Sequence, residues 1–361
     1  MTSSDGLVIP LANSVQVVDP FAGTASPLSI AGLPAGAGTT YSYTVPVFES
    51  PTSFLLGTGS AVPTLRNLYR VTWSAGSGWT ATQLNVGSFS LIVYVAQAAV
   101  LPSGIYVVGN PSGGTGGLGA YVYSVPTGGG APSLYANLTA AGAQGLGNAM
   151  TAVGTSLHVF TADVTTTAPD AQHWEVDTTT VPPTLTFRGS LPDSLYPSTP
   201  PFNFGSAQAA WDPFSGNLVI SAVEGDVLWR TPSGANVNQI LSPGTCAGGF
   251  GGNPRHDALA LNLNTNAIGL GDGCANYDEL RCDSTLFLDD LVVVPPPTTG
   301  GGLFRLAYVP STANYLEDGQ GCAGSSGLVP CNYVTSLPTA GNASFAITLA
   351  NALPSTAAFL V

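Results

Sequence analysis

A short pattern recurs four times along the chain, and it restricts the fold more than any other feature. Each copy has a polar residue, then small apolar residues, a turn and a run rich in β-branched and aromatic residues. The opening polar residues stand 51, 60 and 49 positions apart. A repeat of this length indicates supersecondary units that bury their cores against their neighbours. The four opening residues are Gln97, Asn148, Gln208 and Asp257.

The sequence around these residues predicts strands and almost no helix. No stretch of about 12 residues keeps a 3.6-residue apolar period without Gly or Pro, whereas short β-rich runs are bounded by turn residues throughout. The clearest unit adds a third run at 227–230, a turn at 231–235 and a fourth run at 237–241. Four strands in a unit of roughly 40–50 residues are typical of a β-propeller blade.

We therefore expect an all-β fold, a β-propeller of about six four-stranded blades over residues 1–310, with a short C-terminal β segment over 311–361. Residues 43–85 fit a further blade, with its third strand at 67–73. The runs 14–19 and 26–30 predict the outer part of an incomplete first blade. The last blade is expected to run from Arg255 to about Val309. Five or seven blades, or a long β-sandwich, are the alternatives.

Composition restricts the partners of such a ring. Charged residues make up 7% of the chain, Lys is absent, and the net charge is −13. An acidic surface with seven scattered Arg residues does not neutralise a phosphate backbone, so we expect no nucleic-acid partner. Apolar runs stay shorter than the roughly 18 residues that a membrane span needs, so we expect no membrane insertion. Cations, glycans and extracellular proteins remain as partners.

Five cysteines gather in the last third of the chain, within Gly-rich or Asn-rich sequence. Loop cysteines at short spacings predict local disulfides and an oxidising compartment. We expect one pair between Cys322 and Cys331, another between Cys274 and either Cys282 or Cys246, and one cysteine left over. A zinc site is the alternative. The first residues show no signal peptide, which leaves a removed leader or a cytosolic chain. The cysteines favour a secreted or cell-surface protein.

Two segments resemble known families. Residues 211–220, with the following run 227–230, resemble a blade of NHL-type or gluconolactonase-like six-bladed propellers. Residues 319–330, 338–345 and 351–354 resemble a C-terminal module of planctomycete-type secreted proteins, which is usually longer than the piece present here. The first resemblance implies a ligand face at the channel, with Ca²⁺ in the lactonase-like enzymes. The second implies secretion and a β segment that docks on the propeller or pairs with another chain.

Inner strands line the channel of a propeller, so the opening polar residues should gather at one rim. Amides, a carboxylate and an imidazole at such a rim are suited to hold a sugar or a metal-bound water. Alternatively, the amides satisfy backbone groups in a water-filled channel. The candidate ligand-binding residues are Gln97, Asn148, Gln208, His256 and Asp257.

The acidic segment 271–283 is a second candidate site. Its carboxylates and amide are hard oxygen ligands that suit Ca²⁺, although the segment lacks the Gly that an EF-hand requires. A solvated acidic loop held by a disulfide is the alternative. The candidate metal ligands are Asp272, Asn276, Asp278 and Asp283.

Signatures of nucleophile-elbow hydrolases, HExxH metalloproteases and P-loop enzymes are missing from the sequence. We therefore expect a non-catalytic extracellular module that binds or organises glycan or protein, and we assign no catalytic residue. The alternative is a Ca²⁺-dependent lactonase-like hydrolase or lyase, for which Glu49 and Glu224 are the additional carboxylates. Self-assembly through the C-terminal β segment is a third option. His158 and His173 are interpreted as isolated, and His158 as a core residue.

Overall fold

The computed structural model shows an all-β chain. It describes residues 7–10, 14–19, 24–60, 62–110, 119–163, 171–191, 204–222, 227–240, 256–262, 267–272, 277–281, 286–288, 307–308, 331–334, 343 and 346–350. These residues form strands joined by turns and one short 3₁₀ helix, η1 (Pro63–Leu65). No helix in this part of the chain is long and apolar enough to cross a membrane.

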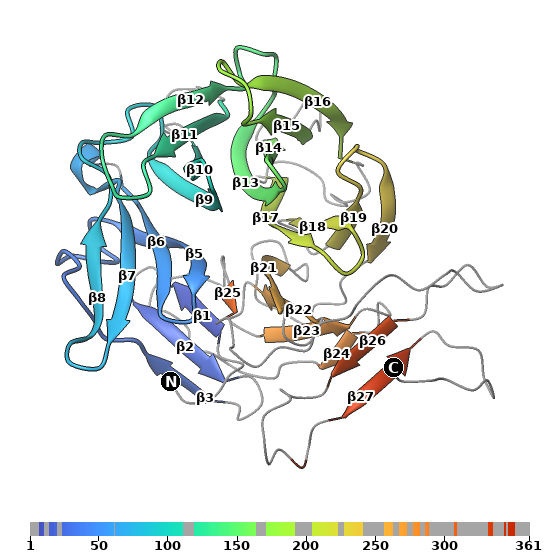
Figure 1. Ribbon diagram of the computed structural model, residues 1–361, viewed down its shortest axis with the longest axis horizontal. Helices are drawn as coiled ribbons and strands as arrows, with labels where there is room; N and C mark the ends of the chain where they lie inside the picture. The colour runs from blue at the N-terminus through green and yellow to red at the C-terminus, as the bar shows by residue number, and fades with distance from the viewer. Residues whose placement is uncertain are drawn as a thin grey trace.

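The strands form six antiparallel sets of four around a centre, in a propeller-like arrangement (Figure 1). The innermost strand of each set faces the centre and the others follow outwards. From inside to outside, blade one has β25 (Ala307–Tyr308), β1 (Leu7–Pro10), β2 (Val15–Asp19) and β3 (Thr24–Pro27); blade two has β5 (Ser42–Ser50), β6 (Ser53–Gly59), β7 (Leu68–Ser74) and β8 (Gly78–Gln83), with β4 (Ile30–Ala31) parallel to β8; blade three has β9 (Tyr94–Leu101), β10 (Gly104–Asn110), β11 (Tyr121–Val125) and β12 (Ser133–Asn137).

The second half of the ring repeats this order. Blade four has β13 (Leu146–Val153), β14 (Ser156–Asp163), β15 (Gln172–Asp177) and β16 (Thr184–Ser190); blade five has β17 (Phe204–Asp212), β18 (Asn217–Ala222), β19 (Val227–Arg230) and β20 (Asn236–Ile240); blade six has β21 (His256–Asn262), β22 (Ala267–Asp272), β23 (Tyr277–Arg281) and β24 (Leu286–Leu288). A separate hairpin, β26 (Cys331–Val334) and β27 (Ile347–Ala350), lies outside the ring (Figure 1).

The ring closes through strands from opposite ends of the chain. Each inner strand contacts the next, in the order β5, β9, β13, β17, β21 and β25, and β25 in turn contacts β5. Ala307–Tyr308 pair with Leu7–Val8, so β25 completes the blade that β1 begins. The prediction that the last blade extends to Val309 was therefore wrong. The free inner edge of β1 takes up this segment, because an unpaired strand edge exposes backbone donors and acceptors.

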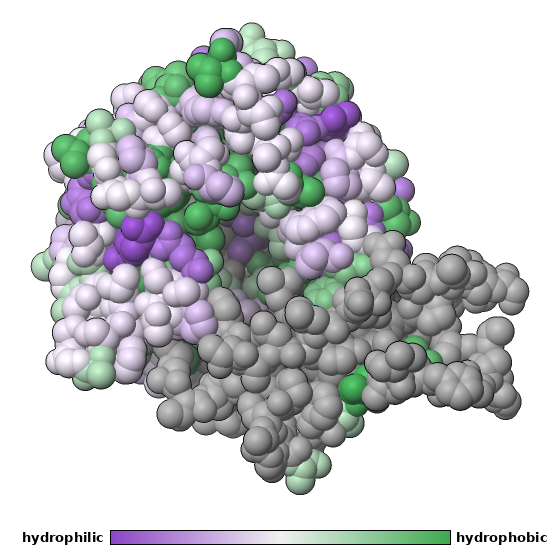
Figure 2. All heavy atoms as spheres, viewed as in Figure 1, coloured by the Kyte–Doolittle hydropathy of each residue, from purple (hydrophilic) through white to green (hydrophobic). Residues whose placement is uncertain are grey.

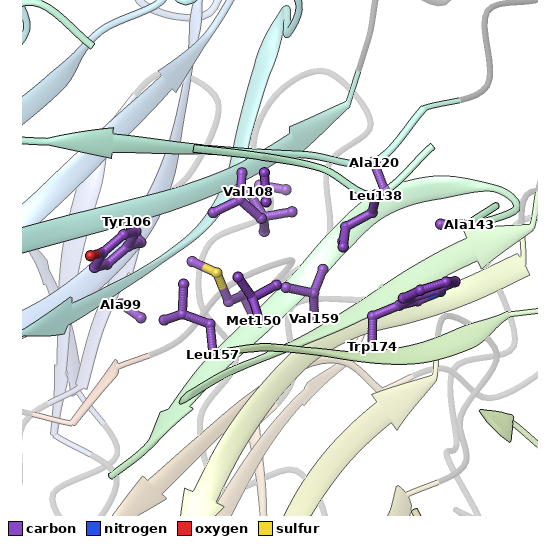
Figure 3. Close-up of a cluster of buried hydrophobic side chains, with 14 of the residues drawn as sticks. Ala99, Tyr106, Val108, Ala120, Leu138, Ala143, Met150, Leu157, Val159 and Trp174 are labelled. Atoms are coloured by element: carbon purple, nitrogen blue, oxygen red, sulfur yellow. The ribbon is translucent and has the colours of Figure 1, made fainter. Parts of the chain in front are cut away.

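Separate apolar clusters fill the five seams from blade one to blade six. Strand alternation explains how one strand serves two seams. In β14, Leu157 and Val159 pack toward blade three, whereas Phe160 packs toward blade five. Figure 3 shows the cluster between blades three and four, which brings Val108 of β10 together with Met150 and Val159 of blade four. Blades therefore hold each other by packing along both faces.

Two tryptophans lie between blades. Trp229 is buried with Leu259 and Ile268 of blade six, and Trp211 packs against the cluster shared by blades four and five. The predicted third strand at 67–73 is also confirmed, one residue displaced, as β7. Tertiary packing thus follows the alternation visible in the sequence.

We predict that Gly57→Ala destabilises the seam between blades two and three. A Cβ at Gly57 would lie 2.5 Å from Thr44 Oγ1 and 3.1 Å from Val95 Cγ1, inside packed surroundings. Overpacking of this kind costs about 1–3 kcal/mol. Urea denaturation followed by circular dichroism measures the effect, and Gly76→Ala, whose Cβ would meet nothing within 4 Å, is the control. Equal stability of the two variants would contradict the prediction.

Candidate functional site: the central channel

Figure 2 shows one face of the molecule hollowed at the centre of the ring, with hydrophilic residues inside the hollow. The inner strands β5, β9, β13 and β17 bound this space in Figure 1. Each inner strand presents an edge that no further strand of its own blade covers. Its backbone groups therefore need other partners.

Gln97 of β9 supplies such partners across the centre. Its Oε1 accepts hydrogen bonds from the backbone N–H groups of Met150, at 2.9 Å, and Ala209, at 3.2 Å. Its Nε2 donates to the carbonyl oxygen of Ala209 at 2.8 Å. Gln97 is only 6% exposed. One side chain thus ties blade three to the inner strands of blades four and five.

Gln208 of blade five makes the corresponding bond to blade six. Its Oε1 accepts from the backbone N–H of Leu259 at 3.1 Å, and its side chain is also buried. Both glutamines therefore make the backbone contacts that we gave as the alternative to ligand binding. A ligand that used these amides would have to replace bonds already made, which disfavours exchange. Ligand binding by Gln97 and Gln208 stays a prediction.

A β-bulge lies near the start of five inner strands, and it separates the four repeat residues into two kinds. Asn148 and Asp257 are themselves the extra residue of the bulge, whereas Gln97 and Gln208 come directly after it. The bulge residues, from blade two to blade six, are Val45, Ala96, Asn148, Ala207 and Asp257. The four residues therefore do not occupy equivalent positions of their strands, because Gln97 and Gln208 stand one residue after the bulge position that Asn148 and Asp257 occupy. Their gathering at one rim stays a prediction.

The remaining candidates of the rim are only partly described. Asn148 is half-buried and has an interaction partner. His256 and Asp257 lie on β21, but their side chains fall outside the described residues. Their roles as ligand-binding residues stay predictions.

The expected calcium ligands lie around β22 and β23. Asp272 ends β22, where its backbone pairs with His256, and Asp278 lies in β23 opposite Leu270. Asn276 and Asp283 lie outside the described residues, as do the side chains of Asp272 and Asp278. Within the described part of the chain, no three His, Cys, Asp or Glu residues form a group that could hold a metal ion.

The additional carboxylates considered for catalysis do not add to a described channel site. Glu49 binds Arg70, with its Oε1 2.7 Å from Nη2, and accepts a bond from Ser53. Burial would raise the pKa of Glu49, but these hydrogen bonds hold it below its usual value. Glu224 lies outside the described residues. So do four of the five cysteines and the side chain of Cys331, which leaves the disulfides as predictions.

A buried polar cluster between blades four and five was missed by the sequence reasoning. His158 and His173, interpreted there as isolated, are joined by a 2.9 Å contact from Nδ1 of His158 to Nε2 of His173. Arg230 of blade five donates from Nε to Nδ1 of His173 at 3.2 Å. The alternation of side chains along β14 could have indicated this contact. His158 and Phe160 lie on the same face of the strand, which is the face toward blade five. The prediction that His158 is buried is confirmed.

The outer hairpin of blade two carries an exposed tryptophan. Trp73 of β7 is 42% exposed and is the cross-strand partner of Trp79 in β8. Trp79 packs on Phe54, with ring centroids 5.4 Å apart. The exposed ring of this pair is Trp73.

Comparisons with known proteins bear on the fold. No protein-family model matches the chain, and no curated protein matches it. A crystal structure of a protein of unknown function from Bacteroides thetaiotaomicron is similar, with a TM-score of 0.50 and 13% sequence identity. The match covers 84% of this chain and 78% of that protein. At this identity the likeness concerns the fold alone.

We predict that Gln97→Leu lowers the free energy of unfolding by roughly 2–4 kcal/mol. The change leaves buried backbone groups of Met150 and Ala209 without these hydrogen bonds, and each orphaned group costs about 1–3 kcal/mol. Gln144→Leu, at an exposed glutamine, is the control and should stay within about 0.5 kcal/mol of wild type. Chemical denaturation measures both. A Gln97→Leu variant as stable as the control would show that these amide bonds contribute little.

Proposed function

We propose that this chain is an extracellular or cell-surface propeller module that binds neutral glycan, with Trp73 as the residue on which a sugar ring stacks. The single observation that carries the proposal is the exposed Trp73 ring in the hydroxyl-rich end of the β7–β8 hairpin, where residues 71–83 carry no charge. The resemblance to NHL-type or gluconolactonase-like blades and to the secreted C-terminal module supports a binding role outside the cell.

The backbone of Trp73 is held in place by its neighbours. Its backbone N–H donates to the carbonyl of Thr52 at 2.9 Å, and its cross-strand partner Trp79 is fixed against Phe54. A tryptophan side chain offers a large apolar face and has only two torsions to fix on binding, so it loses little side-chain entropy. The apolar face of a pyranose ring is a partner of suitable shape and chemistry.

The chemistry around this ring favours an uncharged ligand. Residues 71–83 contain no Asp, Glu, Lys or Arg, while several Thr and Ser residues surround Trp73. Ser74 and Ser77 lie with their hydroxyl oxygens 2.6 Å apart in the turn of the hairpin. Hydroxyls donate and accept hydrogen bonds, as sugar hydroxyls do. The net charge of −13 disfavours acidic polysaccharides.

The lactonase-like alternative has less support. It needs several carboxylates at the channel, and the repeat supplies only Asp257 there. Glu49 is occupied by Arg70 and Ser53. Calcium binding by the segment 271–283 is compatible with either role, as a structural ion or as a cofactor.

We predict that Trp73→Ala weakens binding of a neutral glycan at least tenfold, and that Trp73→Tyr keeps most of it. Removing a central aromatic anchor costs about 1.4 kcal/mol or more, which is a factor of ten. A glycan array selects the probe from cello-, malto- and mannohexaose, and calorimetry measures its affinity.

The matched control is Phe187→Ala. Phe187 is 49% exposed and is likewise the cross-strand partner of a tryptophan, Trp174, but on blade four. Binding should survive in this variant. An array without binding, or equal weakening by both alanine variants, would overturn the Trp73 site, and lactone turnover in the presence of Ca²⁺ would favour the alternative.

A further inference from the structure

The seam between blades four and five has an apolar part and a polar part. Phe160, Leu218 and Leu228 pack together in the apolar part. In the polar part, His173 of β15 meets Arg230 of β19. All three members of the chain His158, His173 and Arg230 are almost fully buried. Buried polar groups at a packed interface require an explanation.

The hydrogen bonds assign one proton arrangement. Arg230 Nε carries hydrogen and only donates, so Nδ1 of His173 must be the acceptor. The proton of neutral His173 therefore lies on Nε2 and is donated to Nδ1 of His158. Arg230 also donates from Nη2 to the backbone carbonyl of Arg188 at 2.8 Å and from Nη1 to Asn236. This chain of bonds joins β14, β15 and β16 to β19 and β20.

The charged groups around the two imidazoles decide what a protonated imidazole would meet. Glu175 of β15 lies beside His158 in register, but it is held by Arg188 Nε at 2.7 Å and by Ser156 Oγ at 2.7 Å. Asp177, at the end of β15, is bound to Thr179 in an exposed turn. The charge nearest to His173 is therefore the buried guanidinium of Arg230.

Protonation of His173 removes the acceptor for Arg230 and places two positive charges side by side in a buried seam. Protonation of His158 removes the acceptor for His173 in the same way. Unpaired like charges in low dielectric repel strongly. We propose that His158, His173 and Arg230 form a proton-controlled latch, which holds the outer halves of blades four and five together when both imidazoles are neutral and releases them in acid.

The direction of the pH effect follows from the pKa of each imidazole. Burial lowers the pKa of His158 to about 4; burial, with the charges of His158, Arg230 and Arg188, lowers that of His173 to about 2. An exposed imidazole has a pKa near 6.5. The open state therefore binds more protons, and the closed latch loses stability as the pH falls below about 6.5.

Hydrogen exchange tests the latch in the full chain between pH 6.5 and 5, where Glu175 stays ionised. After correction for intrinsic rates, protection of amides in β15 and β19 should fall at least tenfold in wild type, while β13 and β17 keep theirs. Each imidazole contributes up to about tenfold per pH unit. The variant His158→Gln/His173→Gln keeps donors and acceptors without titrating, so its protection should not change with pH.

Arg230→Met is the second variant. It removes the donor that spans the seam, so β15 should exchange fast already at pH 6.5. Equal pH dependence in wild type and the double Gln variant would overturn the latch. Parallel loss of protection in β13 and β17 would also overturn it, because that result means global unfolding.

Discussion

The pairing of Ala307–Tyr308 with Leu7–Val8 is the contact on which the ring depends. Without it the blades form an open stack, in which β1 keeps a free inner edge and β5 has no inner strand beside it on that side. An open edge of this kind invites pairing with other chains. With β25 in place, each inner strand has two neighbours. Residues about 300 positions apart thus decide whether the local hairpins become one molecule.

Closure brings the inner edges together and creates a second requirement. Their backbone groups point toward a narrow space where no further strand fits. The side chain of Gln97 forms hydrogen bonds with backbone groups of Met150 and Ala209, which belong to two different blades. The centre of the molecule is thus braced by side chains.

Much of the fold was predictable from the sequence because blades are local. Alternating apolar residues and turn residues predict hairpins such as the one formed by β18 and β19. The third strand of blade two was predicted within one residue. The closing strand was not predictable, since two residues carry no pattern and their partner lies at the other end of the chain. The His158–His173 pair was missed because its residues are 15 positions apart on separate strands and meet only through register. At the channel, the polar residues were found, but the bulges that set their direction leave no mark in the sequence.

Those bulges change what the unit of repetition is. Blades three and five carry alanine and then glutamine at this point, whereas blades four and six carry asparagine or aspartate and then alanine. Gln97 and Gln208 stand 111 positions apart, and Asn148 and Asp257 stand 109 apart. In each pair the glutamine of one blade caps the inner strand of the next. From blade three to blade six this contact therefore recurs with every second blade, so that blades three and five each brace the blade that follows them.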